Sequence, residues 1–373
     1  MKAVFAGGGT GGHVFPALAI AQRLKKNISD FKVVFIGKTG KIEEIIAKKN
    51  KFTFYGIPSG KFSEVRLAEI SKFIFQTISG FIKAVFILTK EKPDFIIGCG
   101  GYVSFPTVLA AILLMKPVYL IEQNSLPGKV NRILAPFARK VFFGMPLEFD
   151  NKKNKKWIWT GNPLREDLVK KDRSETLNFF NFDPHKKYIG VVGGSQGARF
   201  FNEIMPQTLK LLGHKMDIGV IHICGKGNKR EVKKTYRDLG VEANVLDFLE
   251  DMANMYSLVD IIVSRAGALT ISEISVFGVP AVFIPYPYAA QDHQKLNAKK
   301  VSGFGAAVWM HEAEANPDRL AEAMENILKH NDAADKMKSA WKNFVKGDSV
   351  NTILSHIKED LENSKNPCLP LGI

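Results

Sequence analysis

The strongest chemical signal in the sequence is a glycine-rich segment that contains one histidine. Residues 7–16 read Gly-Gly-Gly-Thr-Gly-Gly-His-Val-Phe-Pro, between an apolar stretch at 1–6 typical of a strand and a stretch at 17–26 typical of a helix. A strand, a glycine turn and a helix N-terminus expose backbone N–H groups and the positive end of the helix dipole, which together suit an anion. His13 is a candidate general base, because imidazole exchanges protons near neutral pH. A histidine that only braces the loop is the alternative.

The same segment satisfies the dinucleotide-binding pattern G-x-G-x-x-G, which begins at Gly7. That pattern also requires an acidic residue at the end of the second strand, where it holds the ribose hydroxyls. The second predicted strand, 32–37, is followed by Lys38 and Thr39. The missing acid disfavours an NAD-dependent oxidoreductase.

Two more glycine turns follow predicted strands. Residues 98–102 read Gly-Cys-Gly-Gly-Tyr, and residues 193–199 read Gly-Gly-Ser-Gln-Gly-Ala-Arg before a predicted helix at 201–212. The hydroxyl of Ser195 and the neighbouring amides suit a phosphate group. An ordinary Ser/Gly turn is the alternative.

Other common chemistries have no support in the sequence. There is no G-x-x-x-x-G-K-[ST], no H-E-x-x-H and no Asp-x-Asp motif, so we expect no metal site and no cofactor. Cys99, Cys224 and Cys368 are isolated, which argues against zinc and disulfides and fits a reducing compartment.

Apolar strands alternate with helices along both halves of the chain, which predicts parallel sheets covered by helices on both faces. After a charged break at 151–156 the pattern restarts near residue 188. We therefore expect two Rossmann-like domains, 1–160 and 161–345, followed by a helix and tail at 346–373.

The formal net charge of +15 over 373 residues indicates an anionic partner. A predicted helix at 65–90 combines apolar residues at helical spacing with nearby lysines, which favours peripheral attachment to an anionic membrane surface, although core packing explains part of the apolar stripe. Its most apolar stretch, 73–89, is shorter than a bilayer span, so we expect no transmembrane helix and, since the chain starts with a strand, no signal peptide. Nucleic acid is not expected.

Seven segments occur in a fixed order over most of the chain: GGGTGGHVFPALA, GCGGYVSFP, IEQNSLPG, GNPLR, GGSQGAR, SRAGALTISE and DHQKLNA. Together they resemble the MurG family of N-acetylglucosaminyltransferases, from residue 1 to about residue 344. The resemblance implies an α/β GT-B fold, with two Rossmann-like domains facing across a cleft and a C-terminal helix that crosses back to the N-terminal domain. It implies that GlcNAc moves with inversion from UDP-GlcNAc to the 4-hydroxyl of MurNAc in undecaprenyl-diphospho-MurNAc-pentapeptide (lipid I), giving lipid II for peptidoglycan. The implied location is the cytoplasmic face of the bacterial inner membrane, where other cell-wall or division proteins are expected partners.

The resemblance also implies roles for individual residues. The implied UDP-GlcNAc-binding residues are Thr10, Gly11, Gly12, Asn124, Arg165, Ser195, Leu249, Ala268, Leu269, Thr270, Glu273 and Gln294. Gly100, Gly101 and Tyr102 would form an acceptor-side loop, and His13 would take the proton from the acceptor hydroxyl. Ser195 would hold the donor diphosphate, whose negative charge grows as UDP leaves. Glu273 would hold the ribose hydroxyls, the backbone at Leu249 would receive uracil, and Gln294 would contact the transferred sugar.

Three alternatives remain open from the sequence, and one residue departs from the family pattern. Thr270 and Glu273 also form a T-x-x-E capping box, in which the carboxylate would serve the backbone instead of a ligand. Phe105 stands where the family commonly has a small residue, so its ring is expected to narrow the second glycine loop or shift the acceptor. The chain could also be a non-catalytic binding module, or a related transferase with another nucleotide sugar or a diacylglycerol acceptor.

Overall fold

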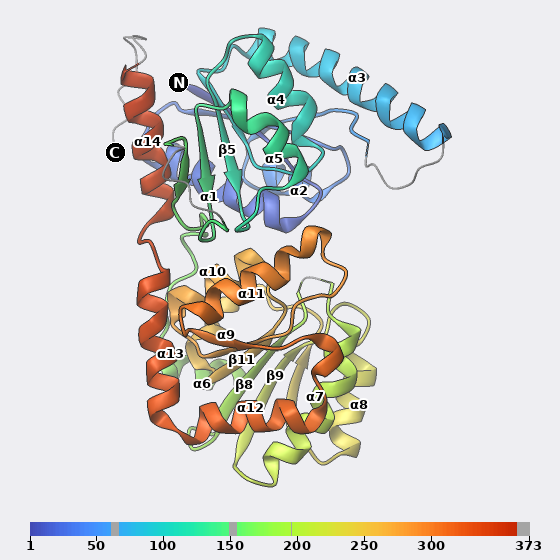
Figure 1. Cartoon of the computed structure of the whole chain (residues 1–373), viewed down its shortest axis with the longest axis vertical. Coiled ribbons are helices and arrows are strands. Elements are labelled where there is room, and N and C mark those ends of the chain that lie inside the picture. Colours follow the sequence, from blue (N-terminus) through green and yellow to red (C-terminus); the bar gives the residue numbers. More distant parts are fainter. Residues whose placement is uncertain (61–66, 149–154, 195, 364–373) are drawn as a thin grey trace. The chain divides into compact units, whose positions relative to one another are not determined.

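The computed structural model describes residues 1–60, 67–148, 155–194 and 196–363. The chain divides into two compact units, Met1–Arg165 with Lys346–Ile373 (unit 1) and Glu166–Val345 (unit 2). Each unit holds one parallel β-sheet that alternates with helices (Figure 1). This arrangement confirms the predicted two-domain α/β architecture.

Unit 1 contains a seven-stranded parallel sheet with the order β3-β2-β1-β4-β5-β6-β7. The strand order reverses between β1 and β4, which places the loops after these two strands at the topological switch point where ligands bind in such sheets. The elements are β1 (Lys2–Ala6), α1 (Gly11–Asn27), β2 (Lys32–Gly37), α2 (Ile42–Lys49), β3 (Thr53–Gly56), α3 (Leu67–Glu91), β4 (Phe95–Gly98), α4 (Ser104–Leu113), β5 (Val118–Glu122), α5 (Lys129–Leu134), η1 (Ala135–Phe137), β6 (Lys140–Phe143), β7 (Trp157–Trp159) and α14 (Ser349–Asn363).

Successive strand residues of unit 1 serve opposite faces of the sheet, as the period of two requires. Phe5 and Phe35 belong to a core cluster on the face covered by α1 and α14. Val4 and Val34 belong to the cluster on the other face, which α3, α4 and α5 cover. Both faces are therefore buried, and this explains why the strands are nearly continuous apolar runs.

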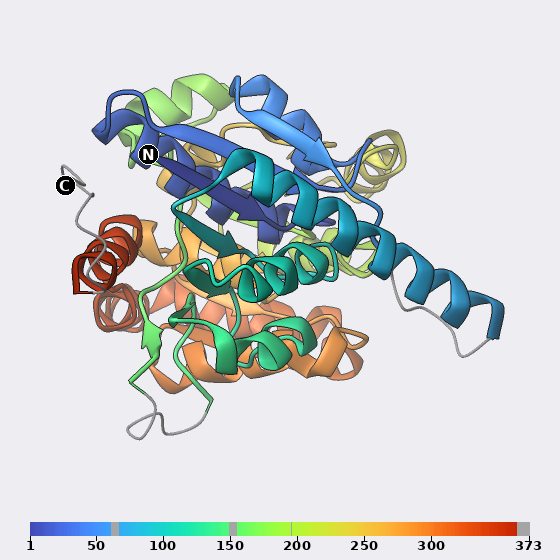
Figure 2. The same cartoon turned by 90° about the horizontal axis from the view of Figure 1, so that it is seen from above.

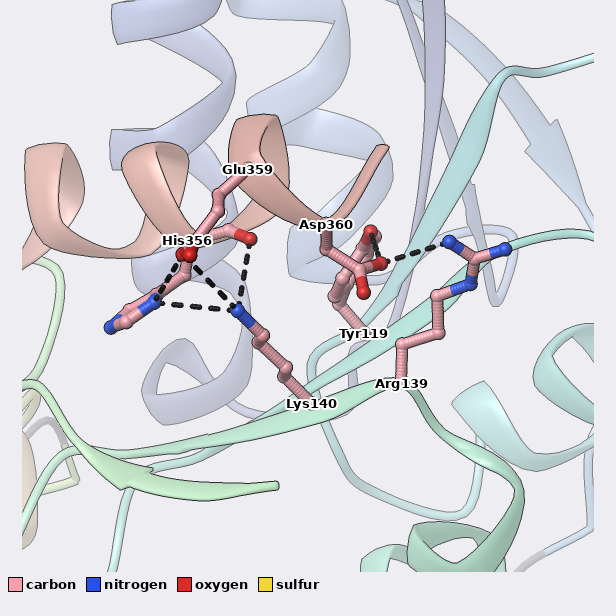
Figure 3. Close-up of polar contacts among 6 residues, drawn as sticks. All are labelled: Tyr119, Arg139, Lys140, His356, Glu359 and Asp360. Carbon is pink, nitrogen blue, oxygen red and sulfur yellow. Dashed lines mark hydrogen bonds and ion pairs between the residues drawn. The ribbon is translucent and has the colours of Figure 1, made fainter. Parts of the chain in front are cut away.

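The C-terminal helix α14 returns to unit 1, as predicted, and a polar cluster anchors it beside β5 and β6 (Figure 3). Tyr119 Oη donates a hydrogen bond to Asp360 Oδ2 at 2.6 Å, and Arg139 pairs with the same carboxylate at 3.0 Å. Lys140 Nζ donates to the backbone carbonyl of His356 at 3.2 Å. Burial lowers the pKa of His356 and the charge of Lys140 lowers it further, against an opposite effect of Glu359, so the net shift favours the neutral imidazole.

Unit 2 contains a six-stranded parallel sheet with the order β10-β9-β8-β11-β12-β13, which repeats the reversal seen in unit 1. The elements are α6 (Arg173–Phe180), β8 (Lys187–Val192), α7 (Arg199–Gly213), β9 (Ile218–Ile223), α8 (Lys229–Asp238), β10 (Ala243–Leu246), α9 (Met252–Leu258), β11 (Ile261–Ser264), α10 (Ala268–Phe277), β12 (Ala281–Phe283), η2 (Ala290–Asp292), α11 (His293–Gly303), β13 (Ala307–Trp309), η3 (Glu312–Glu314), α12 (Pro317–Lys329) and α13 (Asn331–Phe344).

The structure differs from the sequence expectations in a few elements. Helix α1 begins at Gly11, inside the glycine segment, because an open turn of glycines can still adopt helical dihedrals at its end. Helices α5 and α6 and strand β7 were not expected, since each is short and has little periodicity of its own. The tail at 366–373 and most of the charged break lie outside the described residues.

Helix α3 projects outward from the rest of unit 1 in two perpendicular views (Figures 1 and 2). One side of it packs into the core through Ala84, Ile87 and Leu88. Within the described part of the chain, one stretch of 22 residues, Ile70–Glu91, is long and apolar enough to cross a membrane, with a mean hydropathy of 1.4 and 17% of its most apolar part buried. This differs from the expectation of no such segment, which counted only the shorter run at 73–89.

Candidate functional site

The first glycine loop follows β1 and leads directly into α1. Its anchor is Glu43, a fully buried residue in the first turn of α2. Glu43 Oε2 accepts the backbone N–H of Gly9 at 3.1 Å, and Oε1 accepts the N–H of Lys38 at 3.0 Å. A carboxylate does therefore lie near the end of β2, but it comes from α2. Both of its oxygens accept backbone N–H groups of the protein, so it is not available to a ribose. This finding strengthens the argument against a dinucleotide site in this loop.

His13 lies in the first turn of α1, against the second glycine turn. Its Nδ1 is 3.0 Å from Thr10 Oγ1. A Cβ added to Gly100 would lie 3.0 Å from His13 Cδ2, and one added to Gly101 would lie 3.4 Å from Nδ1. Both glycines also have positive φ angles, 86° and 76°. The fold therefore brings together His13 and the predicted acceptor-side loop, which are almost ninety positions apart in the sequence.

Tyr102 completes this group from the same turn after β4. A Cβ added to Gly9 would lie 4.0 Å from the Tyr102 hydroxyl, so the ring borders the first loop. Burial raises the pKa of Tyr102, and the charge of Glu43 raises it further, so the phenol stays protonated. The ring of Phe105 packs against the apolar cluster beneath α4, and its effect on the acceptor stays a prediction.

Asn124 lies in the loop after β5, where buried Glu122 organises the chain. Glu122 Oε1 accepts the backbone and side-chain N–H groups of Asn124, each at 3.1 Å. Its other oxygen accepts the N–H of Gly128 at 2.8 Å and the amide of Asn131 at 2.9 Å. With four donors around it, Glu122 serves chiefly to hold this loop in shape.

Arg165, the last residue of the first segment of unit 1, lies close to the start of α1. Its guanidinium carbon is 5.6 Å from the ring centroid of Phe15, a cation–π distance. The same ring would lie 2.9 Å from a Cβ on Gly11. The helix N-terminus and an arginine therefore concentrate positive potential at Thr10, Gly11 and the neighbouring Gly12, which suits a phosphate.

The glycine turn of unit 2 follows β8 and leads into α7. Ser195 lies outside the described residues, so its predicted contact with a diphosphate stays a prediction. On either side of it, Gly194 and Gly197 have φ angles of 90° and 74°, and Gly197 N–H donates to the Gly194 carbonyl at 2.9 Å. The turn thus ends at a helix N-terminus, as an anion site requires.

Glu273 lies one and a half turns into α10, which begins at Ala268 with Gly267 as its N-cap. Thr270 is therefore inside the helix, and the capping-box alternative for Thr270 and Glu273 is wrong. Instead, the Tyr256 hydroxyl donates to Glu273 Oε2 at 2.9 Å and orients the carboxylate. Ala268, Leu269 and Thr270 form the first turn of the same helix.

Leu249 and Gln294 occupy two other strand-end loops of unit 2. Leu249 is buried in the loop after β10, beside Phe248, whose side chain is exposed. Gln294 lies in the first turn of α11, where its Oε1 accepts the N–H of Tyr286 at 2.9 Å. The side chain of Gln294 therefore braces the loop after β12 in this structure, and its contact with a sugar stays a prediction.

Two buried charged residues near the loops escaped the sequence interpretation. One is Glu43, and the other is Arg265, at the end of β11 within the motif SRAGALTISE. Arg265 donates to the carbonyls of Ile284 and Pro285 at 3.1 and 3.3 Å and pairs with Glu312 at 2.5 Å. Arg265 directly follows a strand and precedes Gly267, which was the available signal, whereas Glu43 lies inside a helix and had none. Among the described residues, no cluster of His, Cys, Asp and Glu could hold a metal ion.

Family models and related sequences all indicate one family of glycosyltransferases. The sequence matches the N-terminal domain of glycosyltransferase family 28 over residues 3–143 and the C-terminal domain of that family over residues 188–353. A protein of Halothermothrix orenii is 35% identical over 373 residues, covering 98% of this chain and all of the relative. One of Nitrosococcus oceani is 37% identical over 327 residues, 88% of this chain and 89% of the relative. Both are named UDP-N-acetylglucosamine--N-acetylmuramyl-(pentapeptide) pyrophosphoryl-undecaprenol N-acetylglucosamine transferase.

Solved structures give the same result. The structure of Acinetobacter baumannii MurG superposes with a TM-score of 0.77 at 30% identity, over 96% of this chain and 99% of that one. A UDP-GlcNAc 2-epimerase from Neisseria meningitidis has a TM-score of 0.70 over 96% of this chain and the whole of that one, at 15% identity, and shares the fold alone.

Proposed function

The chain belongs to the MurG group within glycosyltransferase family 28, and we propose how its own residues divide the work of the transfer. The protein is a UDP-GlcNAc-dependent hexosyltransferase that moves GlcNAc onto lipid I and forms lipid II. The observation that carries the assignment of residues is the placement of the seven motif segments. All seven lie in the connections that follow the carboxyl ends of parallel strands, where ligands of open α/β sheets bind.

Unit 2 is proposed to bind the donor. Glu273 accepts hydrogen bonds from the ribose hydroxyls, and Tyr256 holds it in orientation. The backbone at Leu249 receives uracil, Ala268, Leu269 and Thr270 line the nucleotide, and Gln294 contacts the sugar. Ser195 and the N-terminus of α7 bind the diphosphate, whose charge increases as UDP leaves, so this contact strengthens toward the transition state.

Unit 1 is proposed to supply the base and the acceptor side. The 4-hydroxyl of MurNAc attacks the anomeric carbon of GlcNAc, the bond to UDP breaks, and inversion follows from the single displacement. His13 takes the hydroxyl proton at Nε2, with its Nδ1–H donating to Thr10 Oγ1. Gly100, Gly101 and Tyr102 shape the acceptor side. The N–H groups of Gly11 and Gly12 at the start of α1, together with Arg165 and Asn124, contact phosphate and donor groups.

The direct test is transfer of labelled GlcNAc from UDP-GlcNAc to a lipid I analogue. We expect a β-1,4-linked lipid II product from folded full-length enzyme, with UDP-GlcNAc preferred over UDP-GalNAc and UDP-glucose. Transfer to diacylglycerol, or preference for another nucleotide sugar, would assign the chain to a related transferase. If the protein bound the donor but transferred GlcNAc to no acceptor, it would be a non-catalytic binding module.

We also propose that α3 attaches unit 1 to an anionic membrane on the cytoplasmic side. Its outward side carries five exposed apolar residues, of which Phe75 and Phe86 are 73% and 69% exposed. The five are Ile74, Phe75, Ile78, Ile82 and Phe86, four of them spaced four residues apart on one line of the helix. Exposed lysines at 72, 83 and 90 accompany them and suit anionic headgroups.

This attachment predicts a specific loss of vesicle binding. Replacing both Phe75 and Phe86 with serine removes two side chains that each contribute about 1.5–3 kcal/mol when fully buried. We expect binding to phosphatidylglycerol vesicles to weaken at least tenfold in a sedimentation assay, with turnover of a water-soluble acceptor analogue unchanged. Phe179→Ser, which alters an exposed ring of unit 2, serves as the control. Equal vesicle binding by wild type and the double variant would contradict the proposal.

A further inference from the structure

Glu43 is the buried charge that the proposed chemistry leaves unexplained. It is fully buried, and no lysine, arginine or histidine among the described residues forms an ion pair with it. A buried carboxylate normally has a cationic partner, because removing a charge from water is unfavourable. Here the two carboxylate oxygens instead accept the backbone N–H groups of Gly9 and Lys38.

Two glycines leave the space that the Glu43 side chain occupies. A Cβ added to Gly8 would lie 2.3 Å from Glu43 Cδ, and a Cβ added to Gly37 would lie 2.5 Å from Glu43 Cγ. These are two glycines from separate strand ends, β1 and β2, and each would collide with Glu43 if it carried a side chain. The glycine segment therefore accommodates an internal anion as well as a ligand.

The position of the carboxylate determines what the first loop can offer to a substrate. Backbone N–H groups of a strand-to-helix glycine loop usually point at a bound phosphate. In this protein the Gly9 N–H is already taken by Glu43, so the loop is held in shape before any substrate binds. The N–H groups of Gly11 and Gly12, further along the same loop, have no intrahelical acceptor because they lie in the first turn of α1.

Gly9 is also the direct connection to the proposed base. It precedes Thr10, the N-cap of α1, and Thr10 Oγ1 is 3.0 Å from His13 Nδ1. Tyr102 borders Gly9 on the other side. A change in the backbone at Gly9 would thus be transmitted to Thr10 and from there to the imidazole.

We propose that Glu43 is a positioning residue of the transferase, which fixes the first glycine loop through the Gly9 N–H and so sets the orientation of His13. The inference rests on the proposed role of His13 as the base. Glu43 itself touches neither substrate, because its side chain is enclosed between α2 and the two strand ends.

Glu43→Gln in the full-length enzyme is the central test. The amide preserves size but turns an NH₂ group toward the N–H of Gly9 or of Lys38, so one of the two hydrogen bonds is lost. We expect kcat to fall about 10- to 100-fold and the KM for UDP-GlcNAc to stay within about twofold, because the donor is assigned to unit 2. Glu43→Asp, which keeps two acceptor oxygens for the N–H groups of Gly9 and Lys38, should restore part of the lost kcat.

Glu44→Gln is the matched control. Glu44 is the next residue of the same helix and accepts the N–H of Gly40 at 2.6 Å while pairing with Lys48, but it does not touch the first loop. We expect wild-type kcat and pH profile for this variant. An equal fall in kcat for the Glu43 and Glu44 variants would mean that Glu43 only stabilises α2, and this result would overturn the inference.

Hydrogen exchange tests whether Glu43 fixes the first glycine loop, independently of whether His13 is the base. In Glu43→Gln, the amides of residues 7–14 should exchange faster than in wild type or in Glu44→Gln, and this holds whatever the base is. The double variant His13→Ala/Glu43→Gln should show no further loss of kcat beyond His13→Ala, since both changes act on one group. Wild-type kcat in His13→Ala would refute the base assignment alone, whereas unchanged exchange together with unchanged kcat in Glu43→Gln would refute the inference.

Discussion

Replacing His13 with alanine is expected to lower kcat by a factor of about 10² to 10⁴, the usual contribution of a positioned general base. The KM for UDP-GlcNAc should stay within about twofold, because the nucleotide is assigned to residues of unit 2. The acid limb of the pH profile, which reports protonation of the base, should disappear. The measurement is steady-state transfer of labelled GlcNAc to a lipid I analogue between pH 5 and pH 9.

The geometry around His13 is the reason for placing the largest effect there. Its imidazole lies against Gly100 and Gly101, and its Nδ1 is 3.0 Å from Thr10 Oγ1, which supports the proposal that Nε2 accepts the proton. Thr10→Val should therefore lower kcat as well, but only about tenfold, since the base remains while its orienting partner is lost. His214→Ala, at the exposed C-terminal end of α7, is the control and should leave kcat unchanged. A His13→Ala enzyme within threefold of wild type would place the base elsewhere.

Replacing Glu273 with alanine is expected to raise the KM for UDP-GlcNAc about 30- to 100-fold. A carboxylate that accepts two ribose hydroxyls makes charge-assisted hydrogen bonds, each contributing about 1.5–3 kcal/mol, and part of that loss is recovered by water. Because the ribose is remote from the reacting carbon, kcat should change less than KM. Titration calorimetry with UDP and steady-state kinetics measure the two effects separately.

A substitution at Tyr256 should weaken donor binding less than the loss of Glu273 itself. It holds Glu273 Oε2 at 2.9 Å, so Tyr256→Phe should raise the KM for UDP-GlcNAc only a few-fold by freeing the carboxylate. Glu322→Gln, an exposed residue on α12, is the control for a change of charge in unit 2. If Glu273→Ala binds UDP as tightly as wild type, Glu273 serves the fold of α10 and not the ribose.

Most of the strands and helices that flank the functional loops could be predicted from the sequence alone. Most strands of both sheets are apolar runs, and three of them, β2, β3 and β4, end in glycine. Such runs need no distant partner to be recognised. The predicted strand at 32–37 coincides with β2 (Lys32–Gly37), and the last predicted helix packs in unit 1, as expected. Short elements such as α6 and β7 escaped, because their stability comes from the neighbours that they pack against and not from their own pattern.

The partners within each loop were decided by the tertiary structure. His13 meets Gly100 and Gly101 because the strand order places β1 beside β4, and no local pattern specifies that order. The start of α10 at Ala268 removed Thr270 from the capping position and left Glu273 with Tyr256 as its partner.

No acidic residue follows the second strand directly in the sequence, but the fold places the carboxylate of Glu43 beside the end of that strand. Glu43 reaches the first glycine loop from the first turn of α2, and it accepts the N–H groups of Gly9 in that loop and of Lys38 after β2. Composition and motif order by themselves determined the family and the identity of the candidate residues, since those depend on residue type and order. Which backbone group each carboxylate meets depends on how strands and helices pack, and only the folded chain settles that.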